Sequence, residues 1–177
     1  MLLIYLNGVV LMIISKALLD GIIISIVICV WISVILKVNP RFEMKSYPLK
    51  IVNSVEKQTK NEKKGFLMMA LPMLILVILY LIFSTFFAYK YVSISYLILF
   101  LHLFIVFMIW NAFDLIIFDW LIFCKINPNF MILPGTKGHP AYKDYMYHFI
   151  GYLKGIVLSI AGSAIIAGIV FLIKFTV

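Results

Sequence analysis

The chain has 177 residues, of which 65% are hydrophobic and only 12% are charged, and its mean hydropathy is +1.14. This composition excludes a water-soluble globule, because too few polar side chains are present to cover its surface, and it predicts an integral membrane protein. The net charge of +8 does not indicate nucleic-acid binding, since the basic residues are concentrated between the apolar runs.

Four apolar runs are long enough to cross a bilayer, which takes about 20 residues of helix. They lie at about residues 2–36, 66–88, 92–126 and 152–173. Of the fifteen Lys and Arg, eight lie between the first two runs and four lie in or beside the segment between the last two. By the positive-inside rule we expect cytoplasmic loops at about 37–65 and 127–150, with both termini outside. We therefore predict one all-α, polytopic membrane domain over residues 1–177.

The first run contains an opposite-charge pair, Lys16 and Asp20, which are four residues apart and so share one helix face. As a single helix this run is ~52 Å long, whereas the hydrocarbon core is about 30 Å thick. Two placements of this run are possible. If residues 1–15 lie along the outer face, the Lys16–Asp20 pair lies at the outer interface. If residues 1–15 span the membrane, the pair lies ~22–28 Å deep, close to the inner leaflet.

Two sequence signals mark the end of the first helix and the start of the second. The NP sequence at 39–40 ends the first helix, because a residue before proline avoids the helical conformation. The sequence TKNE at 59–62 matches a capping box and predicts the start of the second helix.

In the third run, His102 is a lone imidazole ~15 Å from the start of the helix. It is interpreted as an interhelical hydrogen-bonding residue rather than a proton relay.

Two further polar residues of the third run lie near its cytoplasmic end. Measured from residue 92, Asn111 lies ~28 Å and Asp114 ~33 Å along the helix, at the inner boundary of the core. With the deeper placement of the first run, these two share one layer with Lys16 and Asp20. Ionised groups within a membrane usually face a partner or a water-filled cavity, so the four residues form the candidate binding site. The structural alternative is a salt-bridge layer that holds two helices in register.

A second constellation lies in or next to the second loop, where Asp119, His139, Asp144 and His148 combine carboxylates with imidazoles. Such groups hold a divalent metal or act as acid and base. They are weak metal candidates, because no HExxH or similarly spaced motif is present. A capping Asp144 that pairs with His148 is the simpler interpretation.

Small residues recur at every fourth position of the last run, where they predict close approach of a neighbouring helix. They are Gly151, Gly155, Ser159, Ser163 and Ala167. The neighbouring helix belongs either to the same chain, which we favour, or to another copy in a homodimer or another membrane subunit.

Two nearly identical helix stops, KVNPRF at 37–42 and KINPNF at 125–130, occur half a chain apart. They predict an internal repeat with one unit at about 1–88 and the other at about 89–177. Because each unit has two spans, the units share one orientation, which is a 2+2 parallel repeat. Convergent helix-stop chemistry is the alternative explanation.

Several short motifs together resemble a family of small, uncharacterised bacterial multi-pass membrane proteins. The residues that carry the resemblance are Asp20-Gly21, Asn39-Pro40-Arg41, Tyr47-Pro48, Asp114, Asp119-Trp120, Pro134-Gly135-Thr136, Tyr142-Lys143-Asp144-Tyr145 and His148. The resemblance implies a four-span protein of the bacterial cytoplasmic membrane and brings no activity with it.

Three functional hypotheses follow from these patterns. The leading hypothesis is a non-enzymatic protein that binds or transports an ion, a lipid headgroup or a small polar solute at an inner-leaflet polar cavity. The second is a membrane-embedded enzyme that acts on a lipid or isoprenoid substrate. It would use four side chains around a metal or as an acid–base pair, namely Asp114, Asp119, Asp144 and His148. The third is an assembly subunit of a larger membrane complex, which would use the small-residue stripe. No cofactor is assigned from the sequence, so its identity stays unknown.

Overall fold

The computed structural model describes residues 2–176, with side chains described from Leu11 onward. Within this part of the chain the protein is all-helical and has no strand. Its elements in chain order are α1 (Leu2–Val38), η1 (Pro40–Ser46), α2 (Leu49–Val52), α3 (Lys60–Tyr89), α4 (Tyr96–Phe113), η2 (Asp114–Ile126), η3 (Asn129–Met131), η4 (Pro140–Lys143) and α5 (Tyr145–Thr176). The elements η1, η3 and η4 are 3-10 helices, and η2 is a π-helix that directly continues α4.

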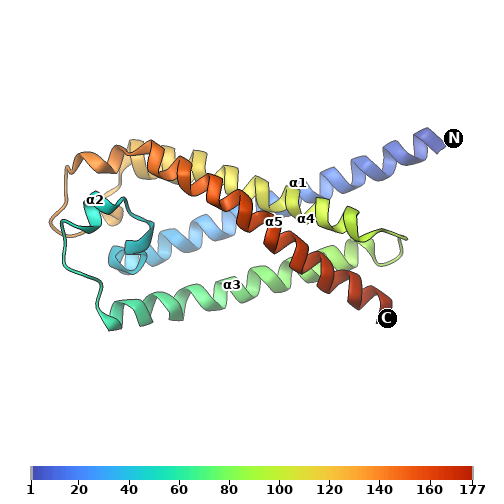
Figure 1. Cartoon of the computed structure of the whole chain (residues 1–177), viewed down its shortest axis with the longest axis horizontal. Coiled ribbons are helices and arrows are strands. Elements are labelled where there is room, and N and C mark those ends of the chain that lie inside the picture. Colours follow the sequence, from blue (N-terminus) through green and yellow to red (C-terminus); the bar gives the residue numbers. More distant parts are fainter. Residues whose placement is uncertain (1, 177) are drawn as a thin grey trace.

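Four helical segments of the described chain are long and apolar enough to cross a membrane. They are Leu11–Val38, Lys60–Tyr89, Tyr96–Ile126 and Tyr145–Thr176, which confirms the predicted all-α fold with four spans. Figure 1 shows the connecting elements η1, α2, η3 and η4 gathered at one end of the bundle, here called the loop end. The opposite end carries the α3–α4 link and is called the hairpin end. The predicted outside location concerns Met1 and Val177, which lie beyond the described residues.

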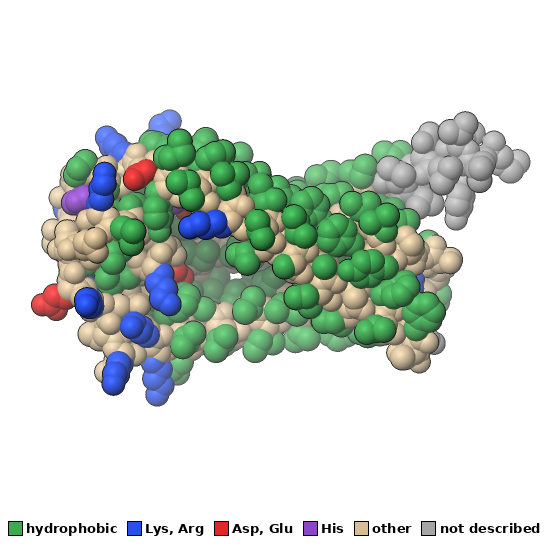
Figure 2. Space-filling model, in the orientation of Figure 1, with side chains coloured by type: hydrophobic (Ala, Val, Ile, Leu, Met, Phe, Trp, Pro, Cys, Tyr) green, Lys and Arg blue, Asp and Glu red, His purple; other side chains and the backbone are tan. Residues whose placement is uncertain are grey.

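Apolar side chains cover the helices in the view of Figure 2, whereas Lys and Arg gather at the loop end. Helix α4 packs closely against both α1 and α5, and α3 stands farther from the other helices (Figure 1). Gly21 allows α1 to approach α4, because a Cβ there would lie only 2.8 Å from the Cβ of Ile109. Gly155 does the same between α5 and α4, where a Cβ would overlap the side-chain amide of Asn111. Without side chains at these two positions, the helices approach closely.

Helix α3 begins at the predicted capping box. The Thr59 hydroxyl accepts a hydrogen bond from the Glu62 N–H at 3.2 Å, and the Glu62 carboxylate accepts one from the Thr59 N–H at 2.7 Å. Both bonds satisfy backbone donors that the first turn leaves free, so the capping-box prediction is confirmed. Glu62 also forms an ion pair with Arg41 of η1, with Nε and Oε1 2.5 Å apart. The start of α3 is thereby tied to the loop end of α1.

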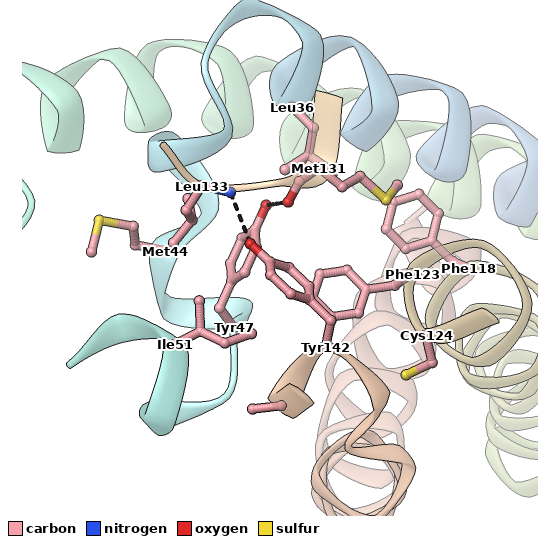
Figure 3. Close-up of a cluster of buried hydrophobic side chains, with 11 residues drawn as sticks. Leu36, Met44, Tyr47, Ile51, Phe118, Phe123, Cys124, Met131, Leu133 and Tyr142 are labelled. Carbon is pink, nitrogen blue, oxygen red and sulfur yellow. Dashed lines mark hydrogen bonds between the residues drawn. The ribbon is translucent and has the colours of Figure 1, made fainter. Parts of the chain in front are cut away.

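The connecting elements at the loop end enclose a small aromatic core (Figure 3). The Tyr47 ring meets the rings of Phe123 and Tyr142 edge-on, with centroids 5.3 Å and 6.3 Å away. The Tyr47 hydroxyl donates to the Met131 carbonyl at 2.7 Å, and the Leu133 N–H donates to the Tyr142 hydroxyl at 2.8 Å. Each buried phenol therefore has a polar partner, as buried tyrosines require. These contacts fix both loops against η2.

The π-helix η2 changes which residues share a face. An α-helix turns about 100° per residue, so residues five apart point in directions about 140° apart. A π-helix bonds each residue to the one five positions on, so such pairs lie one above the other. Phe118 and Phe123 accordingly both enter the aromatic core. The helix ends at Asn127, whose φ of 46° is left-handed and whose N–H donates to the Ile122 carbonyl at 2.8 Å.

The two repeated stops both end a helix and precede a 3-10 turn, but their backbones differ. Asn39 is extended, with φ −162° and ψ 110°, and its side chain accepts a bond from the Arg41 N–H. Asn127 is left-handed. The helix pairs that a repeat would make equivalent also differ, because α4 and α5 pack closely whereas α1 and α3 do not. The internal repeat therefore stays a prediction.

Candidate functional site

The structure does not bring the four residues of the predicted binding site together. Lys16 and Asp20 contact α3 and α4 in the hairpin half, whereas Asn111 and Asp114 face a cavity at the loop end. Asp20 lies beside His102, and Asp114 follows that histidine by ~18 Å along the helix. The prediction of one shared layer required the N-terminus of α1 to lie at the same depth as the hairpin ends of α3 and α4. Instead α1 extends beyond the hairpin end, so the charged pair lies nearer that end (Figure 1).

The hairpin-half cluster is centred on Asp20, whose side chain is fully buried. Its Oδ1 accepts hydrogen bonds from Lys16 Nζ at 2.5 Å and from the Tyr80 hydroxyl at 2.8 Å, and the Ser84 hydroxyl lies 3.0 Å away. The Nε2 of His102 lies 3.6 Å from the other carboxylate oxygen. The predicted pairing of Lys16 with Asp20 is confirmed. One carboxylate thus joins α1 to both α3 and α4.

His102 forms the interhelical contact predicted for it. Its Nδ1 lies 3.0 Å from the hydroxyl of Tyr89 at the end of α3, and both side chains are fully buried. Its Nε2 lies 3.6 Å from Asp20, which is too far for a hydrogen bond, and has no hydrogen-bond partner among the described residues. We interpret the cluster as a structural connection, because its polar contacts join α1, α3 and α4 around the fully buried Asp20 and His102.

A cavity of about 390 Å³, here called the polar cavity, lies at the loop end between η1, η2 and the first turns of α5. Asn111 and Asp114 of the first predicted site line it, and so do Asp119 and His148 of the second constellation. Its other lining residues are Ser46, Leu115, Tyr147, Ile150, Gly151, Tyr152 and Lys154. The structure therefore joins halves of two separately predicted sites.

Asp119 and His148 form a close pair within this cavity. The Nδ1 of His148 lies 3.0 Å from the Oδ1 of Asp119, and only 5% of the histidine surface is exposed. This contact places a proton on Nδ1, because the carboxylate can only accept. The opposite nitrogen, Nε2, is buried and has no hydrogen-bond partner among the described residues. The pair therefore places a buried imidazole and a carboxylate whose side chain is 22% exposed at the wall of the cavity.

The π-helix explains why Asp114 and Asp119 face the same cavity. The two residues are five apart, so an α-helix would point them in directions about 140° apart. In η2 the same spacing brings both to one side, and both line the polar cavity. π-helical segments occur frequently at functional sites. Asn111, one turn earlier on α4, donates to the Tyr152 carbonyl at 3.1 Å and completes this wall.

The other two residues of the second constellation are helix caps. Asp144 accepts a hydrogen bond from the Tyr147 N–H at 3.0 Å and so caps α5, as the simpler interpretation had it. His139 accepts from the Ala141 N–H at 3.1 Å and caps η4. Asp144 does not pair with His148, whose partner is Asp119. Among the described residues, no three His, Cys, Asp or Glu side chains are arranged to hold a metal ion.

The small-residue stripe of α5 faces its own chain. Gly155 abuts Asn111 of α4, and Ser159, Ser163 and Ala167 are buried. Gly151 differs, because it lines the polar cavity and a Cβ there would meet nothing within 4 Å. Since α4 occupies this face, the stripe offers no support for docking another membrane subunit.

Glu43 is a residue of this region that the sequence patterns do not single out. It lines a smaller cavity of about 100 Å³ together with Asp114, Asp119 and His148, which connects it to the polar cavity. Burial raises the pKa of Glu43, and a hydrogen bond from the Ser46 hydroxyl at 3.1 Å opposes that rise. The one available signal was its place in a loop next to a predicted helix stop.

We expect Glu43→Gln to stabilise the protein at neutral pH. Burial favours the protonated form of Glu43, so its pKa is higher in the folded than in the unfolded protein. The stability that the protonated carboxyl contributes is complete below the unfolded pKa of about 4.3. That stability is lost as the pH rises through the folded pKa. The stability difference between variant and wild type should therefore grow between about pH 4.3 and neutrality. Unfolding midpoints measured across this range test the expectation. Glu56→Gln, at an exposed glutamate of the same loop, is the control, and a flat difference for Glu43→Gln would contradict it.

The four membrane-competent helices and the polar residues enclosed at their loop end define a multi-pass helical membrane protein with an interfacial polar cavity. No protein-family model, curated protein or solved structure matches the chain significantly. The arguments for function therefore rest on the residues of the cavity.

Proposed function

We propose that the protein binds the amine or hydroxyl group of a lipid headgroup or small polar solute in the polar cavity. The observation that carries this proposal is the Asp119–His148 pair, which lines the cavity together with Asp114 and whose buried Nε2 has no hydrogen-bond partner among the described residues. Buried polar atoms almost always have a hydrogen-bond partner, so an atom left without one suggests a missing ligand or water.

The charges around the cavity favour a group that donates hydrogen bonds. Asp114 and Asp119 line it and Glu43 adjoins it, whereas Lys154 is its one lysine. Carboxylates accept hydrogen bonds and attract cations, so a primary amine or a hydroxyl suits this lining better than a phosphate does. This distinguishes the proposal from anion binding.

The proposed location is the bacterial cytoplasmic membrane, with the loop end on the cytoplasmic side. Twelve of the fifteen Lys and Arg belong to or border the two loops, and the positive-inside rule places such loops in the cytoplasm. The polar cavity would then open at the inner leaflet, where headgroups and cytoplasmic solutes are both present. Anionic lipid heads would add attraction to the surrounding lysines.

The test uses purified protein in lipid nanodiscs, titrated with ethanolamine and, separately, with inorganic phosphate. The side-chain nitrogens of His148 are followed by NMR after selective histidine labelling. We expect saturable shifts with ethanolamine and none with phosphate. Equal responses to both, or no response to ethanolamine, would overturn the proposal.

Substitutions at matched carboxylates locate the binding. Asp114→Asn should weaken ethanolamine binding about tenfold or more, because a hydrogen bond to a charged group contributes about 1.5–3 kcal/mol and 1.4 kcal/mol corresponds to tenfold. Asp144→Asn changes a nearby carboxylate that caps α5 and does not line the cavity, so its affinity should stay within about twofold of wild type. A similar loss in both variants would show that general surface charge, rather than the cavity, attracts the amine.

A second candidate function is a membrane enzyme acting on a lipid or isoprenoid substrate. The same pair favours it, because an imidazole oriented by a carboxylate is a common general base. Asp114 shares the cavity with the pair, but Asp144 does not, so three of the four predicted residues converge. The nearby Ser46 hydroxyl donates to Glu43 rather than to His148, so the attacking group would be water. Hydrolysis of a fatty-acyl ester by wild type but not by His148→Gln would establish this activity, and equal background in both would remove it.

A further inference from the structure

A second cavity, of about 540 Å³ and here called the apolar cavity, is lined by α1, α3, α4 and α5 in the membrane-spanning part of the bundle. Figure 2 shows the surface hollowed between α3 and α5. Its lining is made of aliphatic and aromatic side chains such as Ile28, Trp31, Val77 and Trp110, together with Gly162. Glu43 is the one charged residue among those that line it.

The apolar cavity lies where α3 has few contacts with the other helices. At the loop end Glu62 pairs with Arg41, and in the hairpin half Ser84 bonds to Asp20. Between these two attachments the Trp31 indole donates a hydrogen bond to the Met69 carbonyl at 3.1 Å. The residues of α1 and α3 that line the cavity lie along the same stretch, so apolar space remains beside this one polar contact.

The contents of the apolar cavity follow from its lining. Water is unsuited to it, because a buried water needs two to four polar partners and this lining provides almost none. Empty space of this size is also unfavourable, because side chains around a void lose their packing contacts. The helices are surrounded by lipid, so a hydrocarbon chain can enter from the bilayer without crossing water.

Glu43 lies between this cavity and the polar one. It lines the apolar cavity and also the cavity of about 100 Å³ that is lined by Asp114, Asp119 and His148. The same three residues line the polar cavity. The three cavities are therefore neighbours that share lining residues, with the apolar space on one side of Glu43 and the acidic space on the other.

We propose that the two cavities form one site for a single-chain amphiphile, whose hydrocarbon chain fills the apolar cavity and whose amine or hydroxyl end lies against Glu43, Asp114 and Asp119. This inference rests on the function proposed above and names its ligand class. An isolated polar solute would use only the acidic half of the site. A phosphate-headed lipid would place its charge against the three carboxylates.

Tryptophan fluorescence tests where the chain lies, because bromine atoms quench only nearby indoles. Trp31 and Trp110 line the apolar cavity, whereas Trp120 donates to the Tyr145 carbonyl at the loop end. The protein in nanodiscs is titrated with hexadecylamine and with hexadecanol, each brominated in mid-chain. We expect saturable quenching in the Trp120→Phe variant, relieved by the unbrominated compound. The double variant Trp31→Phe/Trp110→Phe should show no saturable quenching.

A matched pair of glycine substitutions separates the cavity from the bilayer. Gly162→Leu places a side chain in the apolar cavity. Gly168→Leu adds the same group at a glycine that does not line this cavity and where a Cβ meets nothing within 4 Å. Gly162→Leu should weaken the saturable quenching roughly tenfold, and Gly168→Leu should leave it within about twofold. Equal quenching in both glycine variants, or in both tryptophan variants, would show that the chain only dissolves in the bilayer.

Three probes distinguish the contribution of the headgroup to binding from that of the hydrocarbon chain. They are a long-chain amine, a long-chain phosphate and ethanolamine. Brominated hexadecyl phosphate should quench at least tenfold more weakly than the amine. If ethanolamine binds but the long-chain amine gives no saturable quenching, the polar cavity binds a solute and the amphiphile inference is wrong. If the long-chain phosphate binds as well as the amine, the headgroup assignment is wrong, and the ethanolamine titration then decides the fate of the proposed function separately.

Discussion

Replacing Asp20 by alanine is expected to destabilise the protein by about 3 kcal/mol. The carboxylate is fully buried and is contacted by Lys16, Tyr80 and Ser84. Its removal leaves several polar groups without their partner. Breaking a buried pair costs about 3–5 kcal/mol, and the lower end applies because Lys16 retains 27% side-chain exposure and can extend toward the interface. Reversible unfolding in mixed detergent micelles measures the change.

Two further variants separate charge from packing at this position. Asp20→Asn keeps an acceptor for Tyr80 and Ser84, so its loss should be smaller than that of the alanine variant. The double variant Lys16→Met/Asp20→Leu removes both charges and should recover part of the stability, because the Lys16 ammonium is no longer left without a partner. Tyr80 and Ser84 still lose their acceptor, so the recovery should be incomplete. If Asp20→Ala stays within about 0.5 kcal/mol of wild type, as ordinary surface changes do, the cluster is not the structural connection described above.

Gly155→Ala is expected to destabilise the protein by about 1–3 kcal/mol, the usual cost of overpacking. Its new Cβ would overlap Asn111 Oδ1 and lie 2.9 Å from the amide Cγ. The Asn111 side chain must then move, which breaks its hydrogen bond to the Tyr152 carbonyl and disturbs one wall of the polar cavity. The same unfolding assay reports the loss, and the ethanolamine titration reports the damage to the cavity.

Gly168→Ala provides the control on the same helix, and its expected effect has the opposite sign. A Cβ at Gly168 would meet nothing within 4 Å, so the substitution adds no clash. Alanine is favoured over glycine within a helix by about 0.8–1.0 kcal/mol, so Gly168→Ala should stabilise the protein modestly. A loss of stability in both variants would mean that helix propensity and membrane context, rather than contact with Asn111, control these positions.

Several local features could be predicted because their causes lie within a few residues of sequence. Apolar runs of sufficient length indicated four spans, and TKNE at 59–62 indicated a capped helix start. The four-residue spacing of Lys16 and Asp20 indicated their ion pair, and a lone His102 on an apolar helix indicated an interhelical bond. Each rests on helix geometry or on the cost of an unpaired polar group in lipid.

The composition of the candidate site could not be predicted in the same way. Asp114 and Asp119 share a cavity because η2 is a π-helix, and their spacing in an α-helix would separate them. Glu43 lies at the site because η1 packs against α1 and α3. The Arg41–Glu62 ion pair and the aromatic core around Tyr47 hold η1 in this position. The prediction that Asp20 and Asp114 lie at the same depth was wrong. The position of a residue along its own helix does not determine how far that helix is shifted relative to its neighbour.

The sequence by itself determined that this is a helical protein of the membrane, where its four spans lie and which polar groups they carry. Composition and periodicity suffice for that, since lipid requires each span to satisfy its own backbone hydrogen bonds. Only the tertiary structure decided which polar residues meet. Helix offset, the π-helical turn of η2 and the distance of α3 from the bundle arise from contacts between segments far apart in the chain. Those contacts place the Asp119–His148 pair in a cavity, with Glu43 between that cavity and an apolar space within the membrane.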